Sequence, residues 1–293
     1  MKRVFCLGNG ESRKDVNLDA LKPHGKIYGC NALYRDFTPD VLVAVDQGII
    51  HEIYHSGYAF KNECYFRNWH TNKAENYNMT VYGTEEKKTI DFIESLNLKD
   101  ENEKGNSNKF VLGGTSLISM ARSVMKDKSK LEEFRNQFKT KISWIKNDKV
   151  KSIKEVQGGQ DLGWAAGPSA IWLAIKNEQP NQVYLIGHDL NSKTNMINNM
   201  YKGTDNYSPV NHKPTPSNNW LIQLNALINE NPDIAFYKVN REPLNNNCKV
   251  NRQQPELRGH KNLVYITYDD LQKRIDKRWW DGNRLLSRRQ FTK

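Results

Sequence analysis

Polar residues and glycines stand at the ends of four short apolar runs, where they can take part in binding or catalysis. In chain order they are Gly8, Asn9, Gly10, Asn31, Asp46, His188 and Asp189. If the runs are parallel strands, their carboxyl ends share one edge of a sheet, which is where open α/β folds bind ligands. The sequence therefore predicts that these residues converge on one ligand site.

The turn Gly8-Asn9-Gly10 suits an anion, because its small residues leave backbone N–H groups accessible and a helix is expected behind it. The N-terminus of that helix, together with Ser12, favours a phosphate group. Arg13 stands where a dinucleotide-binding fingerprint has its third glycine, so a purely structural turn is the alternative. Asn31 and Asp46 have alternative roles too, as a turn residue and a helix N-cap.

His188 is a candidate general base, because an imidazole titrates near neutral pH and Asp189 stands beside it. A histidine that only hydrogen-bonds to the rim of the sheet is the alternative. The histidines show no His-x-x-His or His-Glu-x-x-His spacing, and no Asp-x-Asp follows a strand. We therefore predict no metal ligands in this chain.

The elements that position these residues are predicted strands of a parallel sheet. Residues 4–7, 26–30 and 41–45 are apolar runs of the kind that is buried on both faces of such a sheet. Small residues at 165–169 open a predicted helix, and residues 183–187 form a further strand. The expected fold class is α/β, with a Rossmann-like and mostly parallel sheet.

Length and composition agree with an α/β fold and exclude several other classes. The 293 residues allow one large domain or two small ones. No apolar run approaches the roughly 18 residues that span a bilayer, and the N-terminus lacks a signal-peptide cleavage site. The cysteines are widely spaced, which favours a reduced, cytoplasmic chain without structural zinc. They are Cys6, Cys30, Cys64 and Cys248.

The net charge of +11 is concentrated in two segments. Residues 126–154 carry +6 and residues 241–293 carry +7, which leaves −2 for the rest of the chain. Such segments either bind a polyanion, such as nucleic acid or a membrane surface, or stay solvated. In the second segment Trp279 and Trp280 stand among cations, as in single-strand binding, or they dock a helix onto the sheet.

Five segments follow one another in a characteristic order: residues 7–12 (LGNGES), 29–31 (GCN), 39–46 (PDVLVAVD), 166–169 (AGPS) and 183–189 (VYLIGHD). Together they resemble the Rossmann-type glycosyltransferases that comprise the bacterial sialyltransferases and the motility-associated-factor group. The resemblance covers about residues 1–60 and 160–240. His188 departs from it, because an apolar residue usually precedes this aspartate.

The resemblance implies a site for a nucleotide sugar. Asn9 and Asn31 would meet the phosphate and ribose, Gly167 and Ser169 would approach the nucleotide, and Asp189 would hold the base or ribose. Sialyltransferases need no metal; two tyrosines contact the leaving phosphate and a histidine acts as the base. Tyr201, Tyr207 and His212 have comparable places in this chain.

We therefore predict a metal-independent glycosyltransferase that uses a CMP-, UDP- or GDP-sugar and no other cofactor, with His188 or His212 as the base. Residues 1–240 would form the Rossmann-like nucleotide-sugar-binding domain, with a helical lid inserted at about 70–160. The basic extension 241–293 would pack on it. The acceptor stays open between DNA, as in a phage-type modifying enzyme of the host cytoplasm, and an acidic glycan. The alternative is a non-catalytic nucleic-acid-associated or virion protein on the same fold.

Overall fold

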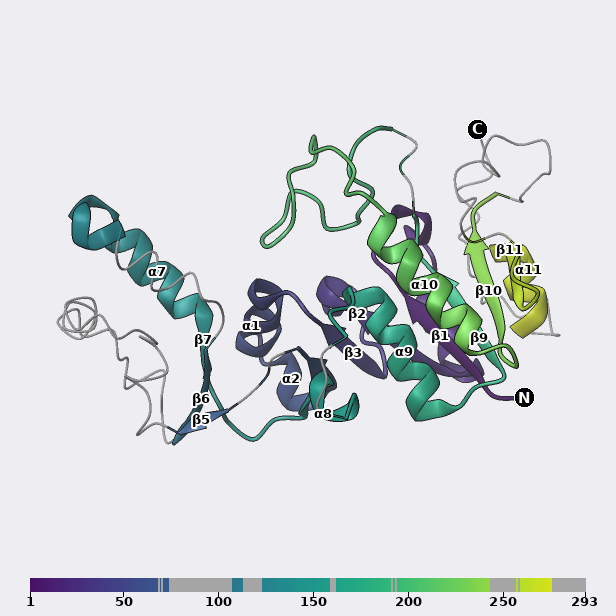
Figure 1. Cartoon of the computed structure of the whole chain (residues 1–293), viewed down its shortest axis with the longest axis horizontal. Helices are drawn as coiled ribbons and strands as arrows, with labels where there is room; N and C mark the ends of the chain where they lie inside the picture. The colour runs from purple at the N-terminus through teal and green to yellow at the C-terminus, as the bar shows by residue number, and fades with distance from the viewer. Residues whose placement is uncertain are drawn as a thin grey trace. The chain divides into compact units, whose positions relative to one another are not determined.

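The computed structural model describes residues 1–67, 69, 71–73, 107–112, 123–158, 162–190, 192, 194–242, 257 and 259–275 of the chain. The chain divides into two compact units (Figure 1). The first combines Met1–Val43 with Leu162–Lys293, and the second is Ala44–Asp161. The predicted insertion at about 70–160 falls within the second unit, and the predicted extension from residue 241 falls within the first.

Six parallel strands form the sheet of the first unit, in the order β11-β10-β9-β1-β2-β3. Their bounds are Arg3–Leu7 (β1), Lys26–Cys30 (β2), Val41–Ala44 (β3), Gln182–Ile186 (β9), Ala235–Asn240 (β10) and Leu263–Thr267 (β11). The chain moves to one side from β1 to β3 and to the other side from β9 to β11. The strand order therefore reverses between β1 and β9, and the predicted Rossmann-like α/β class is confirmed.

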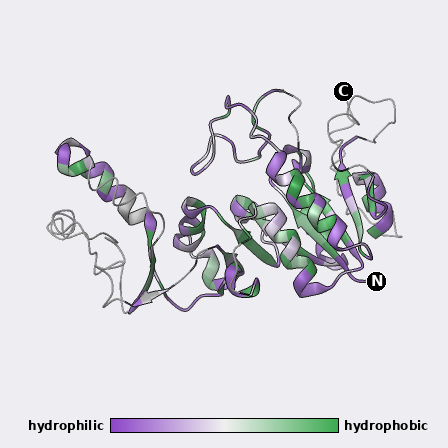
Figure 2. Cartoon of the chain, in the orientation of Figure 1, coloured by the Kyte–Doolittle hydropathy of each residue, from purple (hydrophilic) through white to green (hydrophobic). Residues whose placement is uncertain are grey.

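The strand register brings the predicted site residues to one edge of this sheet. Leu7, the last residue of β1, pairs with Ile186 of β9 on one side and with Gly29 of β2 on the other. The turns that follow these three strands therefore begin side by side. The strands themselves are apolar (Figure 2), as burial on both faces requires.

Helices cover the sheet of the first unit. Helix α9 (Ala166–Glu178) packs on β1 and β2, and α10 (Asn218–Glu230) packs beside α9 (Figure 1). Pro168 lies in the first turn of α9, where its missing N–H leaves no hydrogen bond unmade. Helix α11 (Tyr268–Ile275) packs against β10 and β11, so the described part of the C-terminal segment belongs to the sheet and its cover.

The α-helix predicted behind the first strand is wrong. The chain instead forms two 3₁₀ segments, η1 (Glu11–Arg13) and η2 (Leu18–His24). Asp15 has a left-handed backbone (φ 61) that stops any helix from continuing past η1, and Pro23 lies inside η2. A third segment, η3 (Asn31–Arg35), follows β2. A 3₁₀ turn as short as η1 offers a ligand little of the dipole of a full helix.

The described part of the second unit contains two small groups of strands. β4 (Glu63–Phe66) pairs in parallel with β8 (Val150–Ser152), whereas β5 (Asn72–Lys73), β6 (Lys109–Leu112) and β7 (Ile142–Trp144) pair antiparallel. The helical segments among its described residues are α1 (Gln47–His55), α2 (Tyr58–Lys61), η5 (Lys128–Lys130), α7 (Leu131–Lys141) and α8 (Ile153–Val156). Segments η5 and α7 thus lie within the basic segment 126–154. Among the described residues, no helix has the length and apolarity that a membrane crossing needs.

Candidate active site

The turns after β1 and β9 are joined backbone to backbone. The Gly8 N–H donates to the Ile186 carbonyl oxygen at 2.8 Å, and the Gly10 N–H donates to the Gly187 carbonyl oxygen at 2.8 Å. A Cβ atom on Gly8 would lie 2.5 Å from the Gly187 carbonyl oxygen. Since real Cβ atoms do not approach backbone so closely, the junction requires glycine at this position.

The carboxylate of Asp189 lies against Ser12, just after the glycine turn. Asp189 Oδ2 accepts from the Ser12 N–H at 2.7 Å, and its Oδ1 accepts from the Ser12 hydroxyl. The Glu11 N–H donates to Asn198 Oδ1 at 2.8 Å. The N–H groups of Gly8 and Gly10 are thus engaged by backbone carbonyls, and Ser12 is engaged by the carboxylate of Asp189.

Two further ionisable groups lie buried behind this carboxylate. Lys238 in β10 is 1% exposed, and its Nζ donates to Asn240 Oδ1 at 3.1 Å. Burial lowers the pKa of Lys238 to about 8, and the charge of Asp189 opposes this shift. Burial, followed by the Lys238 charge, lowers the pKa of His188 to about 4. At neutral pH His188 is therefore an uncharged ring.

The imidazole of His188 lies against two glycines. A Cβ atom on Gly8 would be 3.3 Å from its Cδ2, and one on Gly167 would be 3.1 Å from its Cε1. The ring also forms a hydrogen bond with the backbone of Cys6. Its Nε2 is buried and has no hydrogen-bond partner within the described part of the chain. Gly167 thus faces the ring of His188 at the start of α9.

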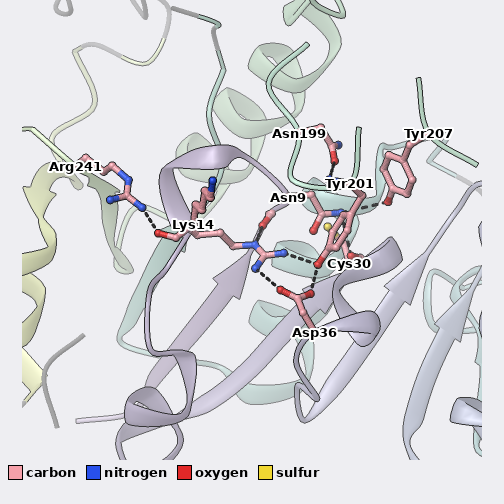
Figure 3. Close-up of polar contacts among 10 residues, drawn as sticks. Asn9, Lys14, Cys30, Asp36, Asn199, Tyr201, Tyr207 and Arg241 are labelled. Carbon is pink, nitrogen blue, oxygen red and sulfur yellow. Dashed lines mark hydrogen bonds and ion pairs between the residues drawn. The ribbon is translucent and has the colours of Figure 1, made fainter. Parts of the chain in front are cut away.

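The side chain of Asn9 lies at the carboxyl ends of β1 and β2. Its Nδ2 donates to the Cys30 carbonyl oxygen at 3.2 Å and to the Tyr207 hydroxyl at 3.4 Å (Figure 3). These contacts fix the amide so that Nδ2 faces the protein. Asn9 Oδ1 is buried, and none of the described residues donates to it. The site therefore presents a buried acceptor that lacks a donor.

Arg13, which is 2% exposed, connects three loops. Its Nε donates to the Gly8 carbonyl oxygen at 2.8 Å, and its Nη1 lies 3.3 Å from Asp36 Oδ2. Its Nη2 donates to the Tyr201 hydroxyl at 2.6 Å. That hydroxyl donates to Asp36 Oδ1 (Figure 3). Burial raises the pKa of Tyr201 well above its ordinary value.

Tyr207 lies beside Tyr201 and meets the turn after β2. The Ala32 N–H donates to the Tyr207 hydroxyl at 3.2 Å. The guanidinium carbon of Arg35 is 5.7 Å from the ring centre of Tyr207 and 5.8 Å from that of Tyr201. Positive charge and a phenol hydroxyl are thus brought together next to Asn9.

No protein-family model matches the chain, and no curated protein matches its sequence. Several solved structures are similar to it. The sialyltransferase CstII from Campylobacter jejuni in complex with the substrate analogue CMP-3FNeuAc is 16% identical, with 91% of this chain and 90% of that chain covered and a TM-score of 0.35. The same sialyltransferase in complex with a trisaccharide acceptor and CMP is 15% identical, with 90% and 89% covered and a TM-score of 0.37.

An α-2,3-sialyltransferase from Campylobacter jejuni in its apo form is 13% identical, with 91% of this chain and 83% of that chain covered and a TM-score of 0.34. These proteins belong to the group that the sequence motifs resemble. At such identities and TM-scores, the function of this chain has to be judged from its own side chains.

Most of the predicted site residues lie in this network, but three do not. His212 is exposed, and its Nδ1 is 2.8 Å from the Lys213 carbonyl oxygen. Ser169 is buried inside α9, where its hydroxyl donates to the Trp164 carbonyl oxygen at 3.4 Å. Asp46 belongs to the second unit and precedes α1 without a side-chain capping bond. Those that share the edge are Gly8, Asn9, Gly10, Ser12, Asn31, which begins η3 directly after β2, Gly167, His188, Asp189, Tyr201 and Tyr207.

Sequence reasoning missed three residues that hold this edge together: Arg13, Asp36 and Lys238. In the sequence, the only unusual feature of Arg13 is that it stands where a dinucleotide-binding fingerprint has its third glycine. Lys238 carries the one usable signal, because a lysine in the middle of an apolar strand is rarely buried without a counter-charge. Nothing in the sequence marks Asp36, which lies at the end of η3.

A second polar cluster lies within the second unit. Ser143 Oγ in β7 is 2.6 Å from His51 Nδ1 and 3.1 Å from His55 Nε2, so it links both histidines of α1 to the strand. Burial lowers the pKa of His51 to about 3. Across the described residues, no group of three or more His, Cys, Asp or Glu side chains could hold a metal ion.

Proposed function

We propose that the protein transfers a sugar from a nucleotide-activated donor, and that the nucleotide binds at the carboxyl ends of β1, β2 and β9. The observation that carries the proposal is the unsatisfied Oδ1 of Asn9 at the point where the strand order reverses. Ligands of open α/β sheets bind at such a point. A buried acceptor without a donor costs about 1–3 kcal/mol, and a ligand that supplies the donor removes that cost.

The chemistry of Asn9 selects the part of the nucleotide that it contacts. An amide oxygen only accepts hydrogen bonds, and an ionised phosphate has no proton to donate. Because Nδ2 is already committed to Cys30 and Tyr207, Asn9 is suited to a ribose hydroxyl or a base amino group. We assign the leaving phosphate to the hydroxyl of Tyr207, with the charge of Arg35 close to its ring.

We assign the catalytic base to His188. The acceptor hydroxyl would attack the anomeric carbon of the sugar and give its proton to Nε2 of the uncharged imidazole. The bond between that carbon and the phosphate oxygen breaks, and the nucleotide leaves with the electron pair. His188 is preferred to His212 because its Nε2 is buried beside the glycine turn, whereas the His212 ring is exposed and engaged with Lys213.

Replacement of Asn9 tests the proposal. We expect Asn9→Ala to weaken nucleotide binding about tenfold to a hundredfold, because the ligand loses its acceptor in a buried position. Titration calorimetry with CMP, UDP and GDP measures the loss. Their 2′-deoxy and 3′-deoxy forms locate it: the hydroxyl that faces Asn9 should matter to the parent protein and not to the variant.

Asn62→Ala is the matched control, because it removes an amide hydrogen bond to the Tyr58 carbonyl oxygen in the second unit. It should leave nucleotide affinity unchanged. If the parent protein binds none of these nucleotides, or if Asn9→Ala binds them as well as the parent does, the proposed donor site is wrong.

We further propose a polyanionic acceptor held by the basic segment 126–154. Lys126, Lys128 and Lys130 are exposed around η5. Each phosphate contact contributes a slope of about −0.9 to log affinity against log salt on duplex DNA. Changing all three lysines to alanine should therefore flatten the slope by about one to three units. The basic and aromatic residues of 276–293 lie outside the described residues.

Fluorescence anisotropy with labelled duplex and single-stranded DNA, between about 50 and 200 mM salt, measures this slope. The control changes three exposed lysines of the first unit, Lys22, Lys26 and Lys176, and removes the same amount of charge. If the two triple variants flatten the slope equally, the segment contributes only general positive charge and is not an acceptor site. No binding at low salt would shift the acceptor to a glycan.

A further inference from the structure

Residues 194–217, which we call the strap, follow β9 and lie against the turns after β1 and β2. The Met200 N–H donates to the Asn9 carbonyl oxygen at 2.9 Å. Lys202 Nζ is 2.6 Å from Glu11 Oε1. Arg35 Nη1 donates to Thr204 Oγ1 at 2.6 Å, so both neighbouring turns contribute contacts to the strap.

Arg13 is the buried centre of these contacts. Its guanidinium reaches the first turn at Gly8, η3 at Asp36 and the strap at Tyr201. Its aliphatic stem passes Gly187, whose φ is +71 and where a Cβ atom would lie 3.1 Å from Arg13 Cδ. One side chain thus fixes the positions of four segments that are far apart in the sequence.

The two tyrosines of the strap differ in what their hydroxyls contact. A phenol hydroxyl has one proton to donate and accepts in return. Tyr201 donates to Asp36 and accepts from Arg13, so both functions are used within the chain. The Tyr207 hydroxyl accepts from Asn9 Nδ2 and from the Ala32 N–H, and so lies beside the unsatisfied acceptor of Asn9.

We propose that Arg13 and Asp36 are positioning residues that clamp Tyr201, and that Tyr201 in turn holds the strap so that Tyr207 reaches Asn9. Tyr201 then acts through Tyr207 and does not contact the donor. The role of Tyr207 at the donor rests on the proposed function, whereas the clamp on the strap does not. A buried arginine forms strong hydrogen bonds with a carboxylate, and breaking the pair would leave the charge of Arg13 without a partner. We therefore expect the clamp to be rigid.

Amide hydrogen exchange in the ligand-free protein tests the clamp. Tyr201→Phe keeps the ring and removes only the hydroxyl. We expect the strap amides of Met200, Thr204 and Tyr207 to exchange about tenfold faster or more, because a hydrogen bond to a charged group is lost. Asp36→Asn, at a half-exposed carboxylate, is a second and milder variant that should loosen the same amides.

Tyr184→Phe is the matched control, because it removes the hydroxyl of a buried tyrosine in β9 that donates to Gln182 Oε1 at 3.1 Å. It should leave the strap amides unchanged, and the amides of β9 should keep their protection in Tyr201→Phe. If both clamp variants leave exchange of the strap unchanged, the clamp is wrong.

Nucleotide affinity then separates positioning from direct contact. With CMP, UDP and GDP as probes, Tyr201→Phe and Tyr207→Phe should each weaken binding about tenfold. The double variant should bind little worse than Tyr207→Phe alone, because Tyr201 acts through that hydroxyl. The positioning role of Tyr201 is wrong if the losses of affinity in the two single variants multiply in the double variant. It is also wrong if Tyr201→Phe binds nucleotides as well as the parent does. If the parent binds no nucleotide, the proposed function fails, while the exchange experiment still decides the clamp.

Discussion

Gly8→Ala is expected to destabilise the protein by about 3 kcal/mol and to abolish nucleotide binding. The loss of stability is that of inserting a methyl group where the surrounding backbone cannot move aside. The added Cβ atom would lie 2.5 Å from the Gly187 carbonyl oxygen and 2.9 Å from the Gly187 carbonyl carbon. Both are backbone atoms, and the Gly8 N–H is held by Ile186 at 2.8 Å. Since neither turn can move without breaking the β1–β9 junction, the Asn9 side chain would be displaced. Urea unfolding and titration calorimetry measure the two effects.

Gly57→Ala is the comparison variant. Gly57 has φ +78, and the nearest atom to its Cβ would be Phe60 Cδ2 at 3.7 Å, so an alanine there is strained but not crowded. It should cost about 1–2 kcal/mol and leave nucleotide affinity unchanged. A Gly8→Ala variant no less stable than Gly57→Ala would show that the two turns do not need their close contact.

The strands could be predicted from the sequence because a parallel sheet buried on both faces requires continuous apolar runs. The run at 26–30 has the bounds of β2, and the runs around it correspond to β1 and β3. The helix behind β1 could not be predicted correctly, because Leu18 and Leu21 fit a 3₁₀ turn as well as an α-helix. Asp15 has a left-handed backbone, which aspartate adopts more readily than most residues but which its residue type does not require.

The convergence of the site residues was predictable, since it follows from parallel strands ending at one edge. The partners of each residue were not. Nothing local indicates that Asp189 binds Ser12, or that Arg13 binds Tyr201, because these pairs form only when distant turns meet. Asp46 also ends an apolar run, yet it lies in the second unit. A shared strand-end position therefore identifies candidates, and tertiary contacts decide their roles.

Asp189→Ala is expected to destabilise the protein by about 3–5 kcal/mol at neutral pH, the range found when one partner of a buried ionic group is removed. Two costs add up. Ser12 loses the acceptor of its N–H and of its hydroxyl. Lys238, which is 1% exposed, loses the negative charge that favours its protonated form. Adding Lys238→Met should recover part of the loss, because the uncompensated charge is gone.

The pH dependence follows from the pKa of Lys238, about 8 in the folded protein against 10.5 for a free lysine. Below pH 8 both states are protonated, and the folded state bears the full cost of the buried charge. Between pH 8 and 10.5 the unfolded state binds more protons, so the contribution of Lys238 to stability rises with pH. The deficit of Asp189→Ala should therefore be smaller at pH 9.5 than at pH 6.5, and Lys238→Met should remove this difference.

Asp40→Ala is the matched control for the double variant. Asp40 Oδ2 accepts from the Ile27 N–H at 2.7 Å, so the control also deletes a carboxylate that holds a backbone donor. Ile27 lies on β2, three strands from β10 and therefore about 14 Å away. Its effect should add to that of Lys238→Met within about 0.5 kcal/mol. The measurement is urea unfolding, at both pH values, of the parent, the three single variants and the two double variants that combine Lys238→Met with Asp189→Ala or with Asp40→Ala. If Asp189→Ala and Lys238→Met are equally additive, no charge interaction links the glycine turn to β10.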